Sequence, residues 1–167
     1  MKVRAAVPED APALGAIHVA TWRTAYRGLV PDERLDGLDP KRSAEMFERL
    51  IEEGDPKTFV AARDDAPLAF LTVGACRDED LEGKAGEIWG IYVTPEAWRQ
   101  GIGRMLCLHG ESILTEKGFA SSALWVFADN DDARRFYEAM GYHVDGASKT
   151  LEIGKPLEAV RYVKSLI

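Results

Sequence analysis

The most constraining feature of the sequence is a strand that leads through a glycine-containing turn into a helix. The run EIWGIYV, Glu87–Val93, is rich in β-branched and aromatic residues and stops before Pro95, as strands commonly do. Gly101 and Gly103 then open a helix that is expected to extend to Lys117. Glycines at such a turn either only shape it or allow a ligand to approach the backbone. With the positive end of the helix dipole beside them, they favour an anion such as a pyrophosphate.

Apolar periodicity and turn residues predict the other elements. Further strands are expected at Lys2–Val7, Thr58–Arg63, Leu68–Ala75, Ser122–Ala128, Tyr142–Val144 and Val160–Leu166. Further helices are expected from a cap at Asp10 to an interruption at Gly28, and over Pro31–Leu35, Pro40–Leu50 and Asn130–Met140. Strand–helix–strand units imply parallel pairing, while the tight turn Asp64–Pro67 implies an antiparallel hairpin. The expectation is an α/β fold, a mixed sheet flanked by helices, in one domain spanning residues 1–167.

Composition and charge exclude several classes of protein. The chain has 21 basic and 28 acidic residues, a formal net charge of −7 and no cluster of Lys and Arg, which argues against a nucleic-acid partner. No apolar run approaches the ~20 residues that a membrane helix needs, and the N-terminal stretch MKVRAAVPED lacks the apolar core of a signal peptide. Cys76 and Cys107 give neither a disulfide framework nor a metal-ligand spacing. We therefore expect a cytoplasmic protein that needs no metal and no membrane.

Two common phosphate-binding motifs do not fit the turn. The signature G-x-x-x-x-G-K-[ST] is absent, and Leu106 stands where a dinucleotide-binding fingerprint needs a small residue. An oxidoreductase with a nucleotide-binding turn stays only as an alternative.

A longer pattern around the turn resembles a known family. Glu87–Leu106, EIWGIYVTPEAWRQGIGRML, is similar to the acyl-CoA-binding core of the GNAT superfamily of N-acyltransferases. Leu124–Tyr142, LWVFADNDDARRFYEAMGY, resembles that family's second segment, V-x-x-x-N-x-x-A-x-x-F-Y-x-x-x-G-[FY]. The fixed positions of this segment fall on Val126, Asn130, Ala133, Phe136, Tyr137, Gly141 and Tyr142. The resemblance implies a GNAT-like fold and an acetyl-CoA-dependent N-acetyltransferase that acts on a primary amine of a small molecule or peptide.

The resemblance also implies where coenzyme A binds. The cofactor is expected between the strands that end near Val93 and Ala128. Its contacts would come from Ile91, Tyr92 and Val93, from the loop residues Trp98, Arg99, Gln100, Gly101, Ile102, Gly103 and Arg104, and from Asn130, Ala133, Phe136 and Tyr137. Trp98 stands at a position that is usually Gln or Arg, and Arg99 at one that is commonly Gly. Main-chain N–H groups grip most of a pyrophosphate, so the loop keeps its function. Arg99 and Arg104 either pair with a phosphate or are solvated, and Asn130 contacts the pantetheine arm, caps a helix, or does both.

Catalysis needs an acid, a base and an oxyanion donor. The resemblance makes Tyr137 the general acid that protonates the departing thiolate; the alternative is a core aromatic residue. Glu87 is the predicted base, with Ile88 and Trp89 expected to raise its pKa. The alternatives are a solvent-facing Glu87, another acid, or ordered water alone. The oxyanion donor would be a main-chain N–H around Ile91–Val93, where Gly90 indicates a bulge or close approach.

The acceptor is less well defined by the sequence. The N-terminal helices usually wall the acceptor pocket in this family, so His18, Trp22, Tyr26 and Trp89 are candidates to line it, although helix-spaced aromatic residues are more often core. The acidic loop Asp78–Glu82 attracts a cation or is solvated surface. A homodimer is a further expectation, with the last strand as a candidate exchange surface. A catalytically silent acyl-CoA-binding module is the alternative from a different functional class.

Overall fold

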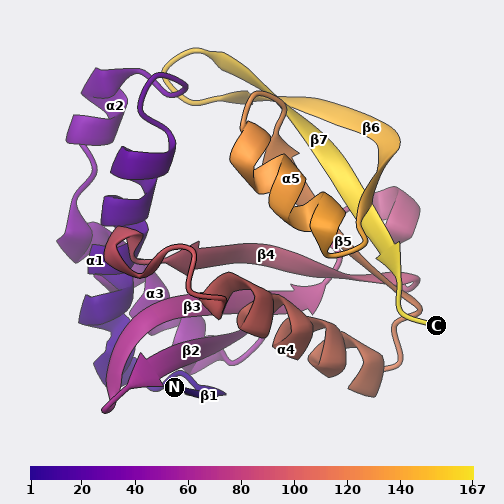
Figure 1. The fold of residues 1–167 in the computed structure, drawn as a ribbon, viewed down its shortest axis with the longest axis horizontal. Coiled ribbons are helices and arrows are strands. Elements are labelled where there is room, and N and C mark those ends of the chain that lie inside the picture. The colour runs from indigo at the N-terminus through magenta and orange to yellow at the C-terminus, as the bar shows by residue number, and fades with distance from the viewer.

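The computed structural model describes all residues, Met1–Ile167, and its centre is one mixed sheet of seven strands (Figure 1). The strands are β1 Lys2–Ala5, β2 Lys57–Arg63, β3 Ala66–Ala75, β4 Ala85–Val93, β5 Ser121–Phe127, β6 His143–Glu152 and β7 Pro156–Ser165. Their order across the sheet is β1-β2-β3-β4-β5-β7-β6. The helices are α1 Ala11–Ala25, α2 Asp32–Asp36, α3 Pro40–Glu53, α4 Ile102–Glu116 and α5 Asp131–Ala139, with short 3₁₀ turns at Pro8–Asp10, Glu79–Leu81 and Pro95–Ala97. The predicted α/β mixed sheet is confirmed.

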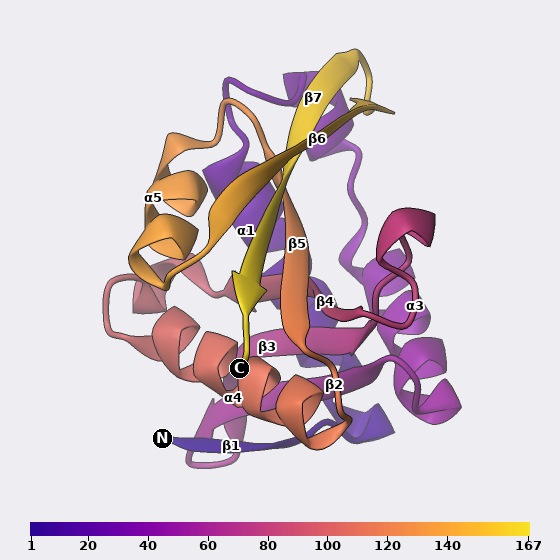
Figure 2. The ribbon, with the colours of Figure 1, turned by 90° about the vertical axis from the view of Figure 1, so that its right-hand side faces the viewer.

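The sheet divides between β4 and β5. Strands β1 to β4 pair antiparallel, as do β5, β7 and β6. The parallel pairing of β4 with β5 covers only Ala85–Glu87 against Ser121–Ala123, and Glu87 opposite Ala123 is its last pair. Beyond this pair the two strands diverge, and Figure 2 shows them running in clearly different directions. We call the gap between the diverging ends of β4 and β5 the splay.

A bulge in β4 lies next to the splay. The register between β3 and β4 shifts between Thr72 and Val73, opposite Gly90 and Ile88. A Cβ atom at Gly90 would lie 2.7 Å from the ring of Tyr92, so a side chain at this position would clash. The bulge and the close approach that Gly90 indicated are therefore both present.

Helices cover both faces of the sheet. Helices α4 and α5 lie on one face, where Leu71, Ile88, Leu106 and Leu124 belong to the largest apolar cluster (Figure 2). Helices α1 and α3 lie on the other face, where their apolar residues form a second cluster with Val60 and Phe70. A third cluster joins the segment after α1 to β5 and the β6–β7 hairpin. Because Ile88 faces α4, the preceding residue Glu87 faces the side of α1 and α3.

Several expected boundaries are wrong. Strand β1 ends at Ala5. Asp10 occupies the N-cap position of α1 as predicted, but its side chain makes no capping bond, because its carboxylate accepts from the main-chain N of Val7 at 2.9 Å and pairs with Arg4 at 2.8 Å. The strand expected at Tyr142–Val144 is the start of the ten-residue β6, which lies at the edge of the sheet and is polar on both faces, so it lacks an alternating pattern. The last strand, β7, pairs on both sides, so it is not a free exchange surface.

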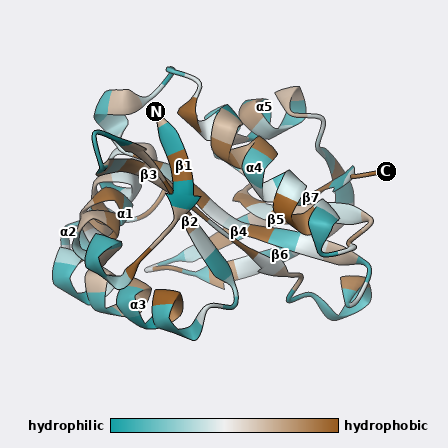
Figure 3. Cartoon of the chain, turned by 90° about the horizontal axis from the view of Figure 1, so that it is seen from below, coloured by the Kyte–Doolittle hydropathy of each residue, from teal (hydrophilic) through white to brown (hydrophobic).

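The helices carry hydrophilic residues over much of their outward surface, as Figure 3 shows for α2 and α3. None of them combines the length and the hydrophobicity that crossing a bilayer requires.

Candidate active site

The loop before α4 presents a row of main-chain donors at one end of the splay. Six consecutive N–H groups, from Arg99 to Arg104, have no acceptor anywhere in the chain. The first helical bond runs from the N of Met105 to the O of Gly101, at 3.1 Å. Gly101 caps α4 with φ 82° and no side-chain bond, and a Cβ atom at this residue would meet nothing within 4 Å. Because no side chain fills this space, the donors can reach the phosphate oxygens of a ligand.

The two unusual residues of this loop have structural explanations. Arg99 has φ 62°, a left-handed conformation that glycine adopts with least strain. A left-handed conformation at position 99 explains why the resembling sequences commonly have glycine there, and Arg99 adopts this conformation without being glycine. The indole of Trp98 donates to the O of Val93 at 2.7 Å, so its side chain ties the loop to the end of β4. The guanidinium of Arg104 contacts the Sδ of Met140 at 3.8 Å.

The end of β4 turns main-chain groups toward the splay. The N of Thr94 donates to the O of Leu68 on β3 at 2.8 Å. Since neighbouring residues of a strand direct their N–H groups to opposite sides, the N–H groups of Val93 and Ile91 point away from β3 into the splay, and that of Tyr92 points back to β3. The O of Val93 also accepts from the Oγ1 of Thr21 at 3.2 Å. The main chain of Tyr92 is thus not brought to the predicted cofactor site.

Helix α5 closes the other side of the loop. The side chain of Asn130 accepts from the N of Ala133 at 3.2 Å, so its capping alternative is confirmed. Its side-chain amide group makes no bond in the chain and stays available for a cofactor contact. The ring of Phe136 would lie 3.4 Å from a Cβ atom at Gly103, so that glycine lets α5 approach the start of α4.

Tyr137 lies between these elements with its hydroxyl free of hydrogen bonds in the chain. Its ring packs against Phe136 and Tyr142, with centroids 5.0 and 5.8 Å away. Burial, and secondarily the nearby Cys107 thiol, raise the pKa of Tyr137 well above its usual value. The phenol therefore stays protonated at neutral pH, as a general acid must.

Glu87 is more strongly engaged than the sequence indicates. Its side chain is 2% exposed, and both of its oxygens accept from Arg77, with Nη2 2.6 Å from Oε2. Ile88 and Trp89 are not its only surroundings, because the guanidinium of Arg77 contacts both the carboxylate of Glu87 and the ring of Trp89. Sequence reasoning missed Arg77, which lies ten positions from Glu87 and meets it only through the β3–β4 connection.

The predicted acceptor residues fall in two groups. Trp22 and Tyr26 pack edge-to-face with each other and with Phe127, with centroids 4.8 to 6.4 Å apart, and share the third apolar cluster. The Nε1 atom of Trp22 is buried without a hydrogen-bond partner. His18 lies beside them, and Trp89 is separate, under Arg77.

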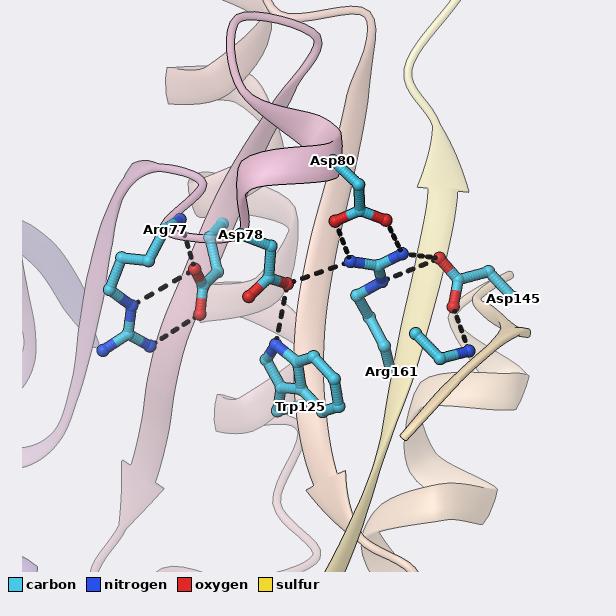
Figure 4. Close-up of polar contacts among 8 residues, drawn as sticks. Arg77, Asp78, Asp80, Trp125, Asp145 and Arg161 are labelled. Carbon is cyan, nitrogen blue, oxygen red and sulfur yellow. Dashed lines mark hydrogen bonds and ion pairs between the residues drawn. The ribbon is translucent and has the colours of Figure 1, made fainter. Parts of the chain in front are cut away.

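A pocket of about 500 Å³ lies on the face of Glu87, next to Arg77. Its lining includes Arg77, Asp78, Trp125, Lys149 and Arg161, and Figure 4 shows Asp78 accepting from Trp125 and Arg161. The acidic loop is therefore not simply solvated, because Asp78 and Asp80 pair with the buried Arg161. Nothing in the sequence pattern singled out Trp125 or Arg161.

Comparison with known proteins decides the family. The sequence model of the acetyltransferase (GNAT) family matches residues 19–142. The chain belongs to this family. The match includes β4, α5 and the loop with the free N–H groups of Arg99–Arg104, which we call the donor loop. It therefore includes both segments of the resemblance.

Individual relatives agree with membership of the GNAT family. An uncharacterized N-acetyltransferase of Bacillus subtilis, YuaI, is 34% identical over 138 residues, which are 82% of this chain and 77% of the relative. The crystal structure of PaiA N-acetyltransferase from Thermoplasma acidophilum in complex with coenzyme A has a TM-score of 0.79 at 21% identity and covers 98% of both chains. The structure of YncA from Salmonella typhimurium with its cofactor acetyl-CoA has a TM-score of 0.75 at 19% identity, covering 100% of this chain and 94% of the other.

As a GNAT member, the chain is an acetyl-CoA-dependent N-acetyltransferase. The oxidoreductase alternative is wrong, because the glycine turn belongs to the matched acetyltransferase segment. The free N–H groups and the open space at Gly101 fit the diphosphate of coenzyme A.

Proposed function

We propose that this GNAT enzyme acetylates a primary alkyl amine that enters from the face of Glu87, with Tyr137 as the acid and Glu87 as the base. The observation that supports this most directly is the row of free donors from Arg99 to Arg104 at the end of the splay. It gives acetyl-CoA a fixed anchor from which the splay leads toward Glu87 and Tyr137.

In this proposal each group of the chain has one task. Acetyl-CoA supplies an acetyl thioester, whose carbonyl carbon the amine attacks. The N–H groups of Arg99–Arg104 hold the diphosphate, and the N–H groups of Ile91 and Val93 hold the groups that enter the splay. Asn130, Ala133 and Phe136 support the opposite side. Holding both reactants in one geometry removes most of the entropic cost of a bimolecular reaction.

Four proton transfers accompany the proposed reaction. An alkylammonium has no lone pair, so Glu87 takes one of its protons before attack. The C–N bond then forms and the C–S bond breaks, and Tyr137 gives its proton to the thiolate. The attacking nitrogen releases a second proton to solvent as the amide forms, and the proton held by Glu87 returns through solvent to Tyr137. The sum is one amide, one thiol and one proton released.

We also propose that the enzyme acts in the cytoplasm and forms a homodimer. Two free thiols, at Cys76 and Cys107, fit a reducing compartment. Sedimentation velocity at micromolar concentration tests the dimer, and a single monomeric species would contradict it.

The proposed function is tested by calorimetry with coenzyme A and by thiol release from acetyl-CoA with a panel of amines. We expect binding, and turnover with at least one alkyl amine. Binding without turnover on any amine would favour the silent acyl-CoA-binding module instead. The absence of any heat of binding would contradict the role of the donor loop.

A further inference from the structure

Arg77 and Glu87 form an ion pair whose partners differ in exposure. Arg77 donates to Glu87 from its main-chain N at 3.0 Å, from Nε at 3.2 Å and from Nη2 at 2.6 Å. The side chain of Glu87 is 2% exposed, whereas that of Arg77 is 53% exposed. No other residue donates a hydrogen bond to this carboxylate. A buried anion thus depends on a single cation that stands half in solvent.

The guanidinium of Arg77 also lies over an aromatic ring. Its central carbon is 3.9 Å from the ring centroid of Trp89. A carboxylate on one side and an aromatic face on the other are the two groups by which proteins commonly hold a cation. We call the space between Glu87 and Trp89 the cation site, and in this structure the chain's own arginine fills it.

The cation site lies where an acceptor would arrive. Glu87 belongs to the last parallel pair before the splay and faces away from α4. The pocket of about 500 Å³ adjoins the site, because Arg77 is in its lining. Glu87 is not in this lining, so a molecule in the pocket contacts Arg77 and not Glu87 while the ion pair is in place.

We propose that Arg77 is a gate, and that the ammonium group of the acceptor displaces its guanidinium from the cation site. The proposal rests on the proposed function, in which Glu87 takes a proton from the acceptor. Arg77 can move into water at small cost because it is already half hydrated. Glu87 cannot lose its partner unless another cation replaces it, because a buried carboxylate without a partner is strongly disfavoured. Arg77 is thus a positioning residue that keeps the carboxylate of Glu87 paired and covered until an acceptor arrives.

This exchange sets the chemical class of the acceptor. An alkylammonium carries the positive charge that replaces Arg77, and it then donates a proton to Glu87. An amine that is neutral at pH 7, such as aniline, cannot compensate the carboxylate and leaves the gate closed. The enzyme should therefore prefer alkyl amines to neutral amines of similar size.

Three variants test the gate. Arg77→Ala removes the gate, and Arg77→Lys keeps a cation without the two-pronged guanidinium. Arg49→Ala is the matched control, because Arg49 is an exposed arginine on α3 without a side-chain hydrogen bond. For each protein, kcat and KM are measured with butylamine and with aniline, and kcat/KM for butylamine is followed across pH.

In Arg77→Ala, the pH profile of kcat/KM for butylamine should differ from that of the wild type, because the guanidinium that contacts the carboxylate of Glu87 is absent. KM for butylamine should fall about tenfold, since the side chain of Arg77 no longer competes with the acceptor for Glu87. The preference for butylamine over aniline should also narrow, because Arg77 no longer blocks the neutral amine. Arg77→Lys should lie between the wild type and Arg77→Ala, and Arg49→Ala should match the wild type.

An unchanged KM and pH profile in folded Arg77→Ala would overturn the gate, and so would a raised KM for butylamine, which would mean that Arg77 holds the acceptor. If Arg77→Ala does not fold, Arg77→Lys decides, and wild-type values in that variant overturn the proposal. Failure of the proposed function is distinguishable, because the wild type would then release no thiol with either amine.

Discussion

At the scale of single residues, Tyr137 and Tyr142 show how two neighbouring phenols differ in role. The hydroxyl of Tyr142 donates to Glu111 at 3.1 Å and accepts from the hydroxyl of Ser122 at 2.9 Å, whereas that of Tyr137 bonds to nothing in the chain. A hydroxyl that contributes no hydrogen bond to the fold is available for chemistry.

Tyr137→Phe should lower kcat by ~10² or more, because a positioned acid is lost, and should leave the unfolding midpoint nearly unchanged. Tyr142→Phe should show the reverse pattern: it should lose roughly 1–3 kcal/mol of unfolding free energy, because Glu111 and Ser122 lose a buried partner, with a far smaller change in kcat. Steady-state kinetics and urea unfolding of both variants check this. An unchanged kcat in Tyr137→Phe would remove Tyr137 from the mechanism.

His18 makes stability depend on pH. Its ring lies 5.3 to 5.6 Å from those of Trp22, Phe47 and Tyr92, and burial lowers its pKa to about 4. Between this pKa and the value of ~6.5 in the unfolded chain, only the unfolded chain takes up the proton. The stability contribution is therefore complete above pH ~6.5 and is lost as the pH falls toward 4.

The advantage of the wild type over His18→Gln in unfolding free energy should thus shrink by up to ~2 kcal/mol between pH 7.5 and pH 5. Urea unfolding of both proteins at the two pH values measures it, and the comparison cancels the carboxylates that titrate in the same range. If the two proteins differed by the same unfolding free energy at pH 7.5 and at pH 5, His18 would be solvated in the folded state.

At the scale of elements, the donor loop before α4 combines backbone strain with ligand access. Gly101 has φ 82° and Gly118, after the other end of the helix, has φ 89°, and a Cβ atom at either residue would meet nothing within 4 Å. Both glycines therefore have a positive φ and open space at the Cβ position, but only Gly101 lies among the free main-chain N–H groups.

Gly101→Ala and Gly118→Ala should each lose about 1 kcal/mol of unfolding free energy, because alanine is strained at positive φ. Only Gly101→Ala should weaken the binding of coenzyme A, since its methyl group enters the space that the diphosphate needs. Calorimetric titration of both variants tests this. Equal affinities would show that the diphosphate binds elsewhere.

The elements that the sequence predicted well are those with strong local signals. Strand β4, the donor loop, α4 and the cap at Asn130 follow from β-branched runs, glycines and helix periodicity. The features that the sequence did not predict depend on contacts between distant segments or have only weak sequence patterns. Strand β6 is polar on both faces, and the pairing of Arg77 with Glu87 arises only when the β3–β4 connection folds back. The partners of the acidic loop come from β5 and β7, far along the chain.

At the scale of the whole molecule, Arg161 joins the two parts of the divided sheet. It lies on β7 and is 5% exposed. It pairs with Asp78 and Asp80, in the connection between β3 and β4, and with Asp145 on β6 (Figure 4). Besides the short parallel pairing of β4 with β5, this cluster is a polar link between the halves of the sheet.

Arg161→Ala should lose roughly 3–5 kcal/mol of unfolding free energy, because it leaves three carboxylates together without their cation. Arg135→Ala is the control, since its ion pair with Asp132 is largely exposed and should contribute little. Thermal and urea unfolding compare the two variants. A loss in Arg161→Ala no larger than in Arg135→Ala would show that the cluster does not hold the halves together.

The divergence of β4 and β5 also connects the stability of the folded protein with the binding of its cofactor. Where the strands separate, the N–H groups of Ile91 and Val93 lack a neighbouring strand, and the pantetheine arm is the natural molecule to take that place. A ligand that binds only the folded chain shifts folding in proportion to the logarithm of its concentration. Acetyl-CoA bound in this place would thus raise the free energy of unfolding, and raising its concentration would stabilise the folded enzyme further.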